Sequence, residues 1–134
     1  MTYKKLRCYS GMKEKIRLDF LPCKDVPADW KWEHWHSCEE SLMVYATDYE
    51  NLLLRYLKAV FPVIDPTSGE IQESIDLCSY NFIGKDVWET IIENIKNDLR
   101  TILDCNEENF YKEFTDWVEQ QLTWADIIVV DGNL

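Results

Sequence analysis

Residues 37–60 read SCEESLMVYATDYENLLLRYLKAV, and they carry the clearest periodic pattern in the chain. Their apolar residues recur at spacings of three and four, which places them on one face of a helix. They are Leu42, Tyr45, Ala46, Tyr49, Leu52, Leu53, Tyr56, Leu57 and Val60. Ser37 and Glu40 have the spacing of a capping box at the start of this helix. Pro62 restricts the backbone of Phe61, so the pattern predicts one helix over residues 37–60.

Downstream of this stretch, helical patterns alternate with breaks. The turn cluster DPTSG at residues 65–69 precedes a predicted short helix over residues 70–78, and a break follows at residues 80–84. Residues 85–103 again repeat apolar side chains at helical spacing. Asn106 predicts the cap of a last helix that ends near Leu122. The apolar run at residues 126–130 predicts a terminal strand.

Upstream, the pattern predicts two short strands, and one or two helical turns over residues 12–18 are the alternative. Residues 6–9 and 16–21 partly alternate in polarity, and Ser10 and Gly11 between them favour a turn. Residues 22–36 contain three tryptophans without a sustained period, which indicates an ordered loop. We therefore predict a single domain over residues 1–134 with a mainly helical α+β fold. It has three principal helices and a small sheet formed by the chain ends.

Composition limits the classes of partner. With 134 residues, 46% of them hydrophobic, the chain has enough apolar surface for one core. Its formal net charge is −11, and residues 1–24 carry +5 of charge while residues 25–134 carry −16. Such a field repels phosphate backbones and anionic lipids, so we expect no direct nucleic-acid binding.

The cysteine pattern and the apolar runs predict the compartment. Five cysteines without a CxxC pair indicate reduced thiols and a cytoplasmic protein. Lys13 and Lys15 interrupt the apolar character near the N-terminus, so we expect no signal peptide. The longest apolar run, residues 127–130, is far shorter than the ~20 residues of a membrane-spanning helix. We therefore expect no membrane association.

Two groups of residues have the chemistry of metal ligands. Cys23, His34, His36 and Cys38 could bind zinc, but their spacing does not fit the paired pattern of structural zinc sites. The carboxylates Asp86, Glu89, Glu93, Glu70 and Glu73 could hold magnesium in a nucleotide phosphohydrolase. A solvated helix face explains their spacing better. Because the chain has no nucleophile elbow, Walker loop or dinucleotide fingerprint, we predict neither enzymatic activity nor a cofactor.

Acidic residues surround the tryptophans of residues 22–36. Large rigid aromatic rings anchor a protein partner, and carboxylates steer a basic partner toward the surface. Covering of the sheet by Trp30, Trp32 and Trp35 is the alternative explanation of these rings. The predicted partner-binding residues are Asp29, Trp32, Glu33, Glu39, Glu40, Glu70, Glu73 and Asp76.

Two segments carry a resemblance to a known class of proteins. Residues 75–88 read IDLCSYNFIGKDVW, and residues 117–134 read WVEQQLTWADIIVVDGNL. They resemble the small acidic immunity proteins of bacterial polymorphic-toxin and contact-dependent growth-inhibition systems. The resemblance implies a binding module that neutralises a cognate toxin, often a nuclease with a basic cleft. Two alternatives stay open: a small metal-dependent nucleotide phosphohydrolase, and a phage-type inhibitor that mimics nucleic acid.

Overall fold

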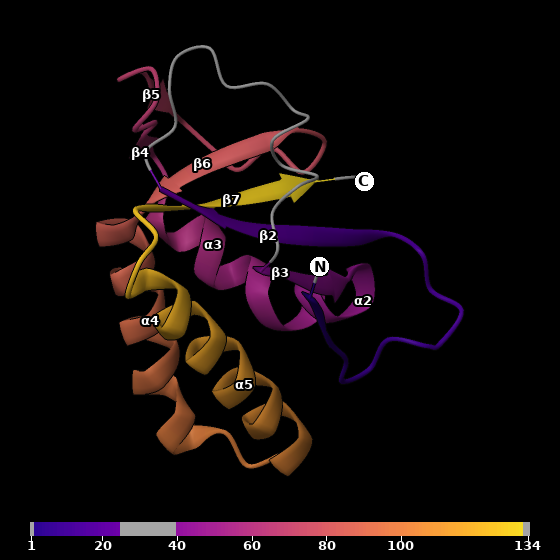
Figure 1. Ribbon diagram of the computed structural model, residues 1–134. Coiled ribbons are helices and arrows are strands. Elements are labelled where there is room, and N and C mark those ends of the chain that lie inside the picture. The colour runs from indigo at the N-terminus through magenta and orange to yellow at the C-terminus, as the bar shows by residue number, and fades with distance from the viewer. Residues whose placement is uncertain (1, 25–39, 133–134) are drawn as a thin grey trace.

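A five-stranded mixed sheet forms the centre of the fold. The computed structural model describes residues 2–24 and 40–132. In spatial order the strands are β1 (Thr2–Leu6), β3 (Glu40–Tyr45), β2 (Arg17–Cys23), β7 (Ile127–Gly132) and β6 (Tyr80–Gly84). β1 runs parallel to β3, and the other neighbouring strands are antiparallel. Figure 1 shows the helices gathered on one side of this sheet.

The predicted fold class is wrong in how the sheet is built. We predicted a mainly helical fold with a small sheet from the chain ends, but β3 and β6 come from the middle of the chain. β3 lies inside the predicted helix over residues 37–60, and β6 occupies the predicted break at residues 80–84. The strand predicted over residues 16–21 is confirmed as β2, whereas the strand predicted over residues 6–9 overlaps β1 only at Leu6. β1 and β2 lie on either side of β3 and do not pair with each other.

Residues 42–45 form a strand that is buried on both faces. Leu42 and Val44 belong to the main core, while Met43 and Tyr45 alternate with them and are also buried. Such a strand reads as a continuous apolar run, and a continuous run also satisfies helical spacing. The sequence pattern therefore could not separate the strand from the helix that follows it.

The helical part of this stretch begins six residues later than Glu40. It consists of α2 (Ala46–Asp48), the π-helical turn η1 (Tyr49–Leu53) and α3 (Leu54–Val60). Glu40 is the first residue of β3, so it does not lie in a helical first turn as the capping box requires; Ser37 lies outside the described residues. The predicted end at Pro62 is confirmed, because α3 ends at Val60 and Phe61 is extended.

The predicted short helix over residues 70–78 is also wrong. Residues 71–72 instead form β5 (Ile71–Gln72), which pairs with β4 (Val63–Ile64) in a hairpin. The turn predicted at residues 65–69 joins these strands. The backbone N–H of Asp65 donates to the carbonyl oxygen of Glu70 at 2.8 Å, and Gly69 has a φ of 78°. This reversal pairs residue 64 with residue 71, so residue 71 enters a strand.

The two long helices and the last strand are confirmed. α4 (Lys85–Asp98) continues into the 3₁₀ turn η2 (Leu99–Thr101), and α5 (Cys105–Leu122) returns beside it. Asp104 caps α5 instead of Asn106. The Asp104 carboxylate accepts from the backbone N–H groups of Asn106 at 2.9 Å and Glu107 at 3.0 Å.

Aromatic rings join the sheet to the helices. Phe20 of β2 packs edge-on against Phe114 of α5 and Trp88 of α4, with ring centroids 5.4 and 6.0 Å apart. The indole N–H of Trp88 donates to the carbonyl oxygen of Ile128 at 3.0 Å. The fully buried indole of Trp88 therefore has its polar atom satisfied by the sheet.

A buried carboxylate fixes the chain where it leaves β1. Asp48, at the end of α2, accepts hydrogen bonds from the backbone N–H groups of Cys8, Tyr9 and Ser10 at 2.9, 2.6 and 3.2 Å. It also accepts from the Ser10 hydroxyl at 2.7 Å, and its side chain is fully buried. The segment after β1 is therefore held against the start of the helical layer.

Replacement of this carboxylate should destabilise the protein strongly. Asp48→Ala leaves the N–H groups of residues 8–10 without their acceptor, and we expect the free energy of unfolding to fall by about 3 kcal/mol. Urea denaturation followed by circular dichroism measures this change. Glu50→Ala on the next turn is the control, since Glu50 is exposed, and a loss of equal size there would contradict the role of Asp48.

Buried tyrosines should make the fold sensitive to alkaline pH. The Tyr111 hydroxyl donates to the carbonyl oxygen of Leu52 at 2.7 Å, and burial raises the pKa of Tyr111 to about 12. The unfolded chain, with a tyrosine pKa of ~10, ionises first. The free energy of unfolding should therefore fall as pH rises from about 10 to about 12, by roughly 2 kcal/mol from this residue. Urea denaturation at a series of pH values measures this loss.

Tyr111→Phe is the matched variant for this pH dependence. It keeps the ring that packs edge-on against Tyr56 but removes the ionisable group, so its stability should fall less steeply above pH 10. Absorbance at 295 nm follows tyrosine ionisation directly in the folded protein. If all seven tyrosines titrate together near pH 10 in the folded state, the expectation is wrong.

Candidate functional site

The β4–β5 hairpin presents two aliphatic side chains to solvent. Ile64 and Ile71 are directly opposite each other in the hairpin, and each side chain is 66% exposed. Val63, the neighbouring residue on β4, is buried. Because the two side chains are exposed side by side, they form a small apolar patch, which makes the hairpin a candidate contact surface.

Asn81 holds the chain that follows this hairpin. Its side-chain oxygen accepts from the Gln72 side chain at 2.6 Å and from the backbone N–H of Asp76 at 2.8 Å. Its amide nitrogen donates to the carbonyl oxygen of Val130 at 3.0 Å and to that of Asp76 at 2.7 Å. Because Asn81 is fully buried on β6, these bonds fix the hairpin segment relative to the central sheet.

Three of the predicted partner-binding carboxylates lie in this segment. Glu70, Glu73 and Asp76 are all exposed, and Glu70 and Glu73 lie immediately before and just after β5. One carboxylate oxygen of Asp76 accepts from the backbone N–H of Cys78 at 2.9 Å, so Asp76 also shapes the turn. The hairpin therefore combines an aliphatic pair with neighbouring negative charge, a surface we call the hairpin face (Ile64, Ile71, Glu70 and Glu73).

The other predicted binding residues are not gathered on the hairpin face. Glu40 is exposed at the start of β3, opposite Thr2 of β1, in a sheet separate from the hairpin. Asp29, Trp32, Glu33 and Glu39 lie outside the described residues. The prediction that they form an interface with Glu40 stays a prediction.

Sequence reasoning missed Ile64 and Ile71. The signal was present, since Val-Ile and Ile-Gln stand on either side of the turn cluster at residues 65–69. Two β-favouring pairs around an Asp-Pro-Thr-Ser-Gly turn fit a hairpin as well as they fit the start of a helix. Because a helix was predicted over residues 70–78, Ile71 was not recognised as a strand residue paired with Ile64.

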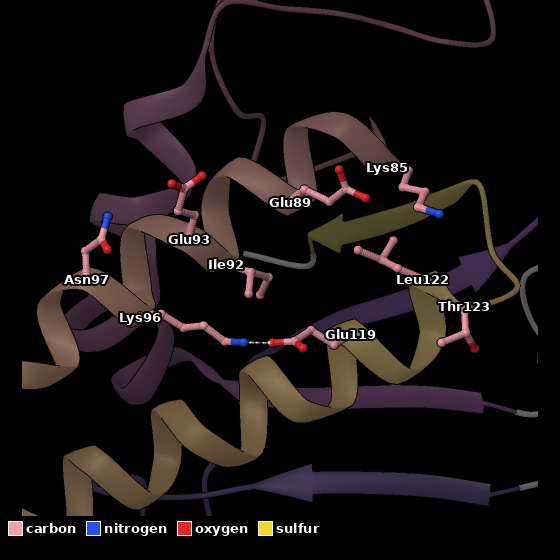
Figure 2. A pocket seen from close by; sticks show the side chains of 9 residues that line it. All are labelled: Lys85, Glu89, Ile92, Glu93, Lys96, Asn97, Glu119, Leu122 and Thr123. Atoms are coloured by element: carbon pink, nitrogen blue, oxygen red, sulfur yellow. Dashed lines mark ion pairs between the residues drawn. The ribbon is translucent and has the colours of Figure 1, made fainter.

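A second surface feature is a groove between α4 and α5. It has a volume of about 600 Å³, and Figure 2 shows the side chains around it. Ile92 of α4 and Leu122 of α5 are buried apolar residues of its lining. The Lys96 ammonium and the Glu119 carboxylate form an ion pair between the two helices. Lys85, Glu89 and Glu93 line the same groove from α4.

The candidate metal ligands do not form a site within the part of the chain that is described. No group of three or more His, Cys, Asp or Glu side chains there could hold a metal ion. Glu89 and Glu93 line the groove, while Glu70 and Glu73 belong to the hairpin. Cys23 is buried at the end of β2, and its suggested partners His34, His36 and Cys38 fall outside the described ranges.

Comparisons of the chain with protein-family models, curated proteins and solved structures gave no match. Among residues 2–24 and 40–132, no helix has both the length and the apolar character needed to cross a bilayer. Function is therefore inferred from the hairpin face, the groove and the charge distribution of the chain itself.

The exposed aliphatic pair should contribute little to folding. In the double variant Ile64→Ser/Ile71→Ser we expect the free energy of unfolding to change by less than about 1 kcal/mol, because both side chains are already mostly in water. Val63→Ser is the matched control on the same strand. Since Val63 is buried, its replacement should cost about 2 kcal/mol. Urea denaturation compares the variants, and equal losses would show that the pair packs inside the fold.

Proposed function

We propose that this chain is a non-enzymatic immunity protein that binds a cognate bacterial toxin with a basic surface and neutralises it by occlusion. The observation that carries the proposal is the hairpin face. Ile64 and Ile71 lie opposite each other, each 66% exposed, with the carboxylates of Glu70 and Glu73 beside them. The resemblance of residues 75–88 and 117–134 to acidic immunity proteins agrees with this use of the surface.

The two kinds of side chain on the hairpin face have separate roles. The aliphatic pair loses water when a partner covers it, which slows dissociation. The carboxylates attract a basic partner over a distance, which speeds association. A nuclease cleft that binds phosphate groups has the matching positive charge, and a carboxylate array placed over it keeps the substrate out.

The position of the hairpin suits this contact. Within residues 2–24 and 40–132, β4 and β5 pair with each other alone and form a sheet distinct from the five central strands. Their attachment through Asn81 gives the hairpin a fixed orientation before binding. A surface ordered in advance loses less conformational entropy when the complex forms.

Co-expression with a toxin tests the proposal. The probe is the toxin domain encoded by a gene adjacent to the gene for this chain, produced in a sensitive bacterium with and without this protein. We expect the protein to restore growth and to form a 1:1 complex with the purified toxin domain. The variant Ile64→Ser/Ile71→Ser should weaken the complex about 30-fold or more, the loss of one binding hot spot. Glu70→Lys/Glu73→Lys should slow association and flatten its dependence on salt.

Matched variants keep this test specific. Glu50 and Glu113 are exposed carboxylates outside the hairpin, so Glu50→Lys/Glu113→Lys repeats the charge change elsewhere and should preserve protection. The proposal is wrong if the toxin domain kills cells regardless of this protein, or if no 1:1 complex forms. Inhibition of a host DNA-binding protein in place of the toxin would favour the nucleic-acid mimic. Nucleotide hydrolysis that requires Mg²⁺ would favour the phosphohydrolase.

A further inference from the structure

The segment between β1 and β2 has a character opposite to that of the groove. We call residues 7–16 the basic loop. It exposes three large apolar side chains, with Met12 84%, Ile16 52% and Tyr9 51% exposed. Lys13 and Lys15 lie between Met12 and Ile16, and both are exposed. The loop therefore offers aliphatic groups and positive charge together.

Internal contacts hold this loop in place. Asp48 fixes residues 8–10, and the Tyr9 hydroxyl donates to the Glu107 carboxylate at 2.7 Å. The Glu14 carboxylate accepts from the backbone N–H of Thr47 at 2.7 Å and from the Thr47 hydroxyl. Among the described residues, Glu14 forms no ion pair with Lys13 or Lys15. The tip is thus presented in a fixed arrangement with its aliphatic groups in water.

The groove between α4 and α5 has the complementary character. Ile92 and Leu122 supply apolar lining, and Glu89 and Glu93 stand one turn apart on α4. Lys85 and Lys96 also line the groove, so the lining has three carboxylates against two ammonium groups, a net charge of −1. Neither carboxylate forms an ion pair within the described chain, whereas Glu119 is paired with Lys96. Lys85 stands one turn before Glu89, but Glu89 and Glu93 still repel each other at this spacing, so a further cationic group beside them relieves the remaining repulsion.

The basic loop cannot fill the groove of its own molecule. Figure 1 shows the segment between β1 and β2 projecting at one end of the molecule, while α4 lies at the other end. The hydrogen bonds of Tyr9 to Asp48 and Glu107 hold the base of the loop at the end of the molecule from which it projects. A second copy of the chain can supply the loop that the groove fits.

We propose that two copies of this chain associate side by side in antiparallel orientation, each placing its basic loop in the α4–α5 groove of the other. An antiparallel pair brings opposite ends together, so both loop-and-groove contacts form in one closed, two-fold dimer. Met12 and Ile16 lie against Ile92 and Leu122. Lys13 and Lys15 lie beside Glu89 and Glu93.

The dimer needs both contacts at once. A groove of about 600 Å³ has the size of a small-molecule site, so one loop gives only a weak contact. The reciprocal contact doubles the apolar area that leaves water. The net charge of −11 on each copy opposes association, but this repulsion is screened beyond about 8 Å at physiological ionic strength, whereas the paired groups are in contact. The hairpin face takes no part in either contact.

Charge reversal tests the dimer directly. Sedimentation equilibrium of the full chain in ~150 mM salt should show a dimer that dissociates on dilution. The loop variant Lys13→Glu/Lys15→Glu and the groove variant Glu89→Lys/Glu93→Lys should each weaken association at least tenfold. In each variant, loop and groove then carry charges of the same sign. An equimolar mixture of the two variants should associate again, because each loop then meets a groove of opposite charge.

Matched controls separate contact from overall charge. Lys58→Glu/Arg100→Glu has the net charge of the loop variant, and Glu50→Lys/Glu113→Lys has that of the groove variant, all at exposed positions. Both controls should dimerise like the unaltered chain, and Met12→Ser/Ile16→Ser should not. Thermal melting checks that every variant is folded. A monomer at all concentrations, a dimer indifferent to the reversals, or a mixture no better than its components would each overturn the proposal.

Discussion

The buried carboxylate of Asp48 accepts hydrogen bonds from three successive backbone N–H groups and a hydroxyl of residues 8–10, and two parts of the molecule depend on it. It fixes the chain just after β1, where the chain leaves the edge of the sheet and returns as β2 on the other side of β3. It also sets the base of the basic loop. Hydrogen bonds to a carboxylate are charge-assisted, so these four bonds compensate for the burial of Asp48. The same geometry thus serves both the fold and the surface.

Asn81 has the corresponding role at the other side of the sheet. From β6 it bonds to the hairpin segment through Gln72 and Asp76, and to β7 through Val130. A buried amide can satisfy all its donors and acceptors only in one arrangement of these neighbours. The hairpin face is therefore held in one orientation even though β4 and β5 lie outside the central sheet. Asp48 and Asn81 each connect one candidate contact surface to the core.

Charge is separated along the chain, and the fold keeps that separation in space. Residues 1–24 carry the excess of positive charge, and residues 85–126 contain eleven Asp or Glu against four Lys or Arg. Since α4 and α5 expose most of these carboxylates, the helical layer is acidic on its outer side. The loop between β1 and β2 stays basic. One chain thereby offers an acidic surface to a basic partner and, in the proposed dimer, a basic loop to a second copy.

The sequence by itself determined the local features of this protein. It predicted the long helices near residues 85–103 and 106–122, the stop at Pro62, the turn at residues 65–69 and the last strand, because capping, proline and amphipathic periodicity act over a few residues. Only the tertiary structure decided that residues 40–45 form β3. Their apolar run fits a helix or a strand equally, and β1 and β2 on either side supply the hydrogen bonds that make it a strand. The same holds for the exposure of Ile64 and Ile71, since which face of a short hairpin is buried depends on what the rest of the chain packs against it.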